Sequence, residues 1–115
     1  MHIKIFSSKV SKEDLSILAN ASYVDMVKGV VDLKKNVLAL GGELHADAEE
    51  VLLNEGSKQE DLWGFNIFLN RPQEEAIEYT SMINIRPRQG NMGREVQDIN
   101  VRKQIKSIID AMVQM

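Results

Sequence analysis

Three segments of the chain carry apolar residues at the spacing of an amphipathic helix, mostly three or four positions apart. The first begins at Ser11, where Ser-x-x-Asp precedes an apolar stretch in the form of a capping box, and is predicted to end near Ala21. The second covers residues 44–52 and is followed by Gly56, a residue suited to a helix C-terminus. The third begins after Asp98 and has the most regular apolar stripe, formed by Val101, Ile105, Ile108, Ile109 and Met112.

The remaining apolar segments favour strands. Residues 3–6 predict a short first strand, and residues 23–40 predict a hairpin of valine-rich and leucine-rich arms. A second hairpin is predicted with arms at residues 62–69 and 76–86, because apolar and polar side chains alternate there. The predicted order is therefore β-α-β-β-α-β-β-α. This order indicates a single α+β domain over residues 1–115, with a largely antiparallel sheet of two hairpins covered by helices.

Composition narrows the class of protein. The chain has 115 residues, of which 43% are hydrophobic and 27% charged, as expected for one folded domain. The absence of cysteine excludes disulfides, zinc knuckles and thiol catalysis. No apolar run approaches the length of a membrane helix and the N-terminus lacks the pattern of a signal peptide, so we expect a cytoplasmic protein without membrane contact. The net charge of −3 argues against a nucleic acid as partner.

Four short segments, taken together, suggest a family. They are Gly-Gly-Glu-Leu-His-Ala-Asp-Ala-Glu at residues 41–49, Leu-Trp-Gly-Phe-Asn at 62–66, Ile-Asn-Ile-Arg-Pro at 83–87 and Gln-Gly-Asn at 89–91. With them the chain resembles an uncharacterised family of small bacterial and archaeal proteins, a domain of unknown function, over about residues 26–110. The resemblance implies a cytoplasmic prokaryotic protein and supplies no catalytic residue.

The predicted start of the second helix holds candidate chemistry. His45 and Glu49 are four positions apart and share one helix face, as two ligands of one metal ion would, and Glu43 is close by. A metal site would need a further ligand such as Glu78, since His2 is the only other histidine. The alternatives are acid–base catalysis by His45 with Glu78, or an exposed face whose acids interact with the helix dipole. We expect no metal and no cofactor.

A polar, glycine-containing loop before the third helix is a candidate anion site. Arginine presents a planar fork to phosphate or carboxylate, and the loop leads into a helix N-terminus. Residues 86–106 carry a net charge of +4, whereas residues 43–61 carry −6, so the two segments could instead pair within the chain or across a homodimer. The candidate anion-binding residues are Arg86, Arg88, Asn91 and Arg94.

Two asparagines lie where strands are predicted. Asparagine is disfavoured in strand interiors, so Asn66 and Asn84 are each expected to have a definite hydrogen-bond partner, either a ligand or the backbone of a neighbouring loop.

Three functions compete. The leading hypothesis is a non-enzymatic binding or regulatory domain that uses the arginine loop for an anionic small molecule. The first alternative is a small enzyme whose pocket joins His45, nearby carboxylates such as Glu78, and Arg86. The second alternative is a homo-oligomerisation module. A cleft shared by His45, Glu78 and Arg86 would favour the enzyme.

Overall fold

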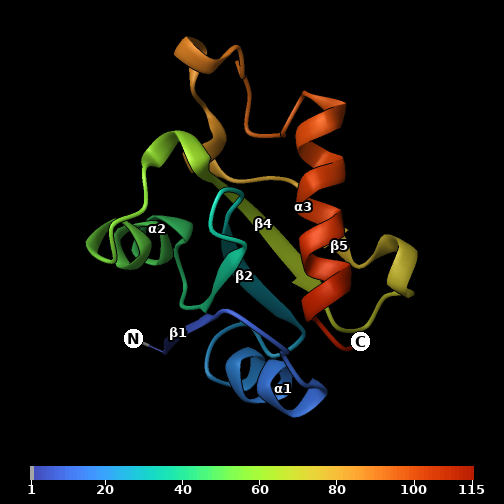
Figure 1. The fold of residues 1–115 in the computed structure, drawn as a ribbon. Coiled ribbons are helices and arrows are strands. Elements are labelled where there is room, and N and C mark those ends of the chain that lie inside the picture. Colours follow the sequence, from blue (N-terminus) through green and yellow to red (C-terminus); the bar gives the residue numbers. More distant parts are fainter. Residues whose placement is uncertain (1) are drawn as a thin grey trace.

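Five antiparallel strands form one sheet, in the order β1-β3-β2-β4-β5, in a computed structural model that describes residues 2–115 (Figure 1). The strands are β1 (Ile3–Phe6), β2 (Met26–Asp32), β3 (Val37–Gly41), β4 (Leu62–Phe68) and β5 (Ile77–Glu78). Strand β2 forms a hairpin with β3 and pairs with β4 along its whole length. Together with three helices, the sheet confirms the predicted α+β class and the predicted order of elements.

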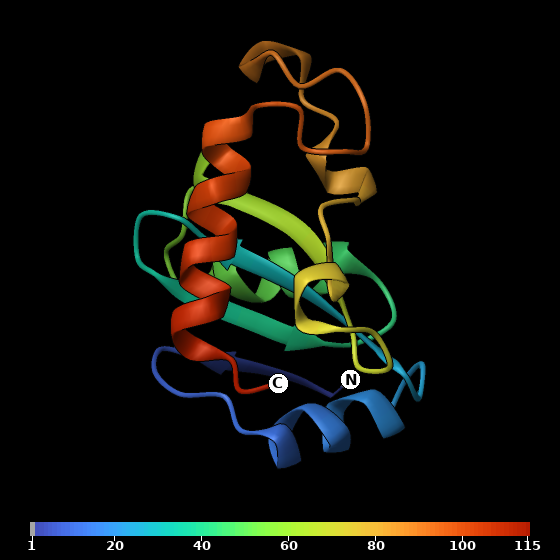
Figure 2. The same cartoon turned by 90° about the vertical axis from the view of Figure 1, so that its right-hand side faces the viewer.

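Helices lie on both faces of the sheet. They are α1 (Lys12–Asn20), α2 (His45–Asn54) and α3 (Ile99–Met112). Figure 2 shows α3 in front of the sheet and α2 behind it. The predicted capping box of α1 is present, since Ser11 and Asp14 each bond the other's backbone N–H at 3.0 Å. No helix in residues 2–115 has the length and apolarity needed to cross a membrane.

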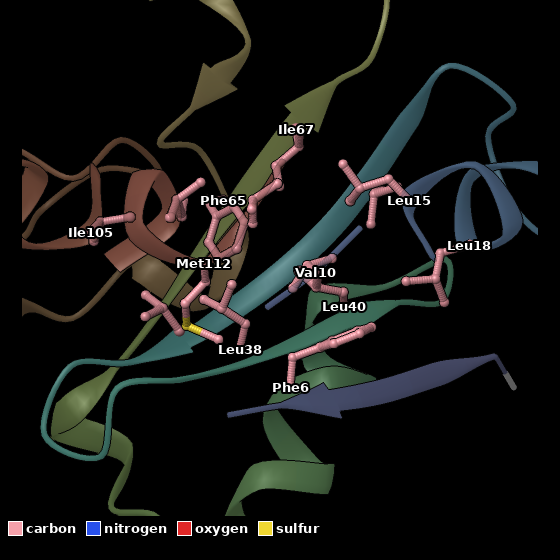
Figure 3. Packing of buried hydrophobic residues seen from close by; sticks show 14 of the residues in the cluster. Phe6, Val10, Leu15, Leu18, Leu38, Leu40, Phe65, Ile67, Ile105 and Met112 are labelled. Atoms are coloured by element: carbon pink, nitrogen blue, oxygen red, sulfur yellow. The ribbon is translucent and has the colours of Figure 1, made fainter. Parts of the chain in front are cut away.

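The two faces of the sheet bury separate apolar clusters. The larger cluster joins α1 and α3 to β2, β3 and β4, with Phe65 and Ile67 of β4 among its fully buried members (Figure 3). The smaller cluster packs Ala48 and Leu52 of α2 against the opposite face. The predicted stripe of α3 is confirmed, because Ile105, Ile109 and Met112 are buried and Val101 and Ile108 pack against the same cluster.

The predicted strand at residues 76–86 is wrong beyond Glu78. Strand β5 pairs with β4 at only two positions, and the chain then turns away. Beyond β5, the side chain of Asn84 takes the place of a neighbouring strand beside β4. Its Oδ1 accepts from the Gly64 N–H at 2.8 Å, and its Nδ2 donates to the Gly64 carbonyl at 3.0 Å. The close approach of Ser81 to β4 requires glycine at position 64, because a β-carbon there would lie 2.5 Å from Cβ of Ser81. The predicted partner of Asn84 is thus the backbone.

Candidate functional site

A cleft of about 290 Å³ opens where the chain leaves β5. It lies between the first turn of α2, the middle of β2 and β4, and residues 80–83. Two exposed apolar side chains, Leu44 and Met82, also line it. Its polar lining comes from Lys28, His45, Asn66, Thr80, Ser81 and Arg94.

The first turn of α2 enters the cleft without a side-chain cap. The residue at the N-cap position is Leu44, which has no hydrogen-bonding side chain, and it is exposed rather than packed as the predicted apolar stripe required. Two glycines with positive φ, Gly41 at 110° and Gly42 at 81°, turn the chain from β3 into this position. The free N–H groups and the dipole of a helix N-terminus favour a negative charge nearby.

His45, the first residue of α2, is buried beside β4. Its Nε2 lies 2.8 Å from the carbonyl oxygen of Phe65. A carbonyl only accepts, so Nε2 carries the proton and the second ring nitrogen, Nδ1, has the lone pair of the neutral imidazole. Burial lowers the pKa of His45 from its ordinary value, and the charge of Lys28 lowers it further, against the hydrogen bond to Phe65 and the nearby side chain of Asn66. The lowered pKa favours the neutral form of the His45 imidazole.

Asn66 lies opposite Lys28 in the pairing of β4 with β2. Its Nδ2 donates to Glu78 Oε1 at 3.3 Å and to the Thr80 carbonyl at 3.4 Å, and these two acceptors fix the orientation of the amide. Its Oδ1 is buried and receives no hydrogen bond from residues 2–115. Glu78, which accepts from Nδ2 of Asn66, is 3.8 Å from Arg71 and does not line the cleft.

Two cations line the cleft, Lys28 from β2 and Arg94 from the segment before α3. The Lys28 ammonium lies 5.3 Å from the centre of the Tyr23 ring. Within residues 2–115, neither cation is within salt-bridge distance of a carboxylate. The cleft is therefore positively charged, although the chain as a whole carries −3.

Arg86 lies outside the cleft and bonds to the backbone. Its guanidinium is stacked 4.3 Å from the centre of the Trp63 ring. It donates to the carbonyls of Ile83, at 3.1 Å, and Leu62. Burial lowers its pKa, against the charge of Glu49. These contacts attach the segment after β5 to the beginning of β4.

The other three predicted anion-binding residues lie in different surroundings. Asn91 is buried, and its Nδ2 donates to three backbone carbonyls, those of Asn84, Gly93 and Glu95, so its side chain organises the loop itself. Arg88 is exposed in the 3₁₀ turn Pro87–Gln89 and does not line the cleft. Of the four candidates, only Arg94 shares the cleft with His45.

The oppositely charged segments meet within the chain, through the backbone. Gln89 donates to the carbonyl of Glu60 at 3.0 Å, next to the contact between Arg86 and Leu62. No carboxylate of residues 43–61 forms an ion pair with residues 86–106 in the part of the chain that the structure describes. Pairing across a homodimer stays a prediction.

The metal candidates in and just before α2 do not form a cluster of ligands. Glu43 is exposed, and its carbonyl accepts from the Tyr23 hydroxyl at 2.6 Å. Glu49 is half-buried, and its Oε2 has no hydrogen-bond partner in residues 2–115. Across those residues, no three His, Asp or Glu side chains lie close enough together to hold a metal ion.

Sequence reasoning missed Lys28 and the exposed position of Leu44. The sequence did contain a sign of Lys28, since a charged residue inside the valine-rich segment of β2 is unusual. Its position opposite Asn66 depends on the register between β2 and β4, which are far apart in sequence.

One protein family matches this chain. The family described as "Protein of unknown function (DUF5674)" has a model that matches residues 4–112, so the chain belongs to this family. The match includes most of the first twenty-five residues, which the sequence resemblance left out. Neither the curated proteins nor the solved structures gave a significant match.

Proposed function

We propose that this member of the DUF5674 family is a non-enzymatic binding domain that holds a small anion in the cleft at the start of α2. One observation carries the proposal: Lys28 and Arg94, without carboxylate partners in residues 2–115, flank a helix N-terminus that no side chain caps. Both features attract negative charge into the same small volume.

A second observation supports a ligand at this position. The buried Oδ1 of Asn66, in the lining of the cleft, has no donor in residues 2–115. Buried polar groups almost always have a hydrogen-bond partner, so an unpartnered acceptor in a cleft favours a donor from a bound molecule. A volume of about 290 Å³ suits a small molecule rather than a polymer. Such metabolite anions are abundant in the cytoplasm, the location that we infer.

Two arginines of the same loop test the proposal, because Arg94 lines the cleft and Arg88 does not. We expect inorganic phosphate and acetate, titrated separately and followed by NMR, to bind the wild-type protein saturably. Arg94→Gln removes one charge-assisted contact and should weaken binding by about tenfold. Arg88→Gln removes the same charge from an exposed turn and should bind like the wild type. Binding should weaken as salt rises, because Arg94 is exposed and its charge is screened.

Two results would contradict the proposal. The first is a spectrum that neither phosphate nor acetate changes beyond the small linear effect of ionic strength. Equal weakening by the two variants would place the binding in the general charge of the loop rather than in the cleft.

A further inference from the structure

Two large apolar side chains line the cleft together with its cations. Leu44 is 58% exposed and Met82 is 67% exposed. Single exposed apolar residues are ordinary on a protein surface, but their grouping in one cleft is typical of a binding site. A simple inorganic anion would contact the cations and the N–H groups of α2, and it would leave both apolar side chains in water.

The backbone beside both residues is fixed, so their exposure belongs to the fold. Leu44 comes directly before His45, which is buried beside β4. Leucine is rare at the N-cap of a helix, where a short polar side chain would satisfy an N–H group. Met82 comes directly after Ser81, which is buried and whose hydroxyl accepts from the N–H of Ile83 at 3.3 Å. Ordered backbone thus holds the two apolar side chains at the surface of the cleft.

We infer that the ligand is a small anion with an apolar chain. The chain contacts Leu44 and Met82, and the anionic group lies toward the two cations and the first turn of α2. Short-chain carboxylates and alkyl phosphates share this chemistry. The charge of the cleft selects an anion, and its volume of about 290 Å³ selects a small molecule. The inference rests on the proposed function, and it adds an apolar part to the requirement for negative charge.

The test lengthens the anion by one methylene at a time. One set runs from acetate through propionate and butyrate to pentanoate, and the other runs from methyl phosphate to butyl phosphate. We expect the affinity of the wild-type protein to rise about threefold with each methylene in one or both sets, slightly less than complete burial of a methylene gives. A rise in one set alone identifies whether the anionic group is carboxylate or phosphate. Butanol and butylammonium have the same chain without the negative charge and should bind far more weakly.

Two methionines in the segment between β5 and α3 provide a matched pair of variants. Met82 lines the cleft, whereas Met92 is 66% exposed and does not line it. Met82→Gln should flatten the rise with chain length and leave the affinity for acetate unchanged, because acetate has no chain to reach this position. Met92→Gln should keep the full rise. Leu44→Ala shortens the other apolar side chain without adding a cap, and it should flatten the rise as well.

The outcomes separate this inference from the proposed function. Equal affinity along both sets, with acetate or phosphate still bound, overturns the apolar chain and leaves the proposed function standing. A rise as steep in Met82→Gln as in Met92→Gln also overturns the inference, because the chain would then lie elsewhere. If butanol binds as tightly as the tightest anion, or if none of the anions binds, the proposed function is wrong and the inference falls with it.

A second copy of the chain is the other occupant that the same variants can reveal. Analytical ultracentrifugation of the wild-type protein and of both methionine variants, without ligand, measures self-association. We expect Met82→Gln to leave the oligomeric state unchanged. A wild-type dimer that Met82→Gln dissociates and Met92→Gln does not would assign Leu44 and Met82 to a subunit interface and overturn the inference.

Discussion

Arg86 and Arg88 are two positions apart, yet their side chains contact quite different surroundings. Arg86 is half-buried against Trp63 and donates to backbone carbonyls from two separate segments of the chain. Arg88 is exposed in a short turn. The sequence presents both as arginines of one polar loop, and only the fold distinguishes a stabilising residue from a surface charge.

This difference predicts unequal effects on stability. Arg86→Ala should lower the free energy of unfolding by about 2–3 kcal/mol, because it leaves partly buried carbonyls without donors and removes the stacking on Trp63. Arg88→Ala should change it by less than about 0.5 kcal/mol, as surface substitutions usually do. Urea denaturation of both variants measures the two values. Equal midpoints for the two variants would mean that Arg86 does not hold the segment after β5 to β4.

At the level of elements, local sequence patterns predicted the features that depend on neighbouring residues, namely the helices and their caps. The caps at Ser11 and Asp98 and the stripe of α3 need no distant contact, and the helices formed as predicted. The arm at residues 76–86 failed because Asn84 bonds Gly64, twenty positions away, in place of a strand. The cleft lies where the chain leaves the sheet after β5, so its lining could not be predicted from the local sequence pattern. His45 and Arg94 were both candidates from the sequence, but the cleft that they share depends on long-range packing.

Helix α3 offers a test of the packing on its face of the sheet. Ile105 is fully buried in the larger cluster, whereas Ile99, at the beginning of the same helix, is 65% exposed. Ile105→Ala should therefore cost about 2–5 kcal/mol in the free energy of unfolding, and Ile99→Ala much less. Thermal and urea denaturation of the matched pair decide the point. A loss for Ile99→Ala as large as that for Ile105→Ala would show that the two positions are equally packed.

For the molecule as a whole, the central feature is a positive cleft on a negative protein. The chain carries −3 overall, and its acidic residues concentrate in residues 43–61. The cleft lies where β5 ends early, and there Lys28, Arg94 and the start of α2 come together. An anion is attracted to this place by local rather than overall charge. We therefore expect the anion in this cleft and not at the exposed turn around Arg88.

The backbone amide spectrum tests this claim most directly. With increasing inorganic phosphate, the N–H signals of His45 and Ala46, in the first turn of α2, should shift and saturate together with the side-chain amide of Asn66. Signals of the exposed turn around Arg88 should follow only the small linear change caused by ionic strength. Saturable shifts confined to the turn around Arg88, with His45 and Ala46 unmoved, would contradict the account.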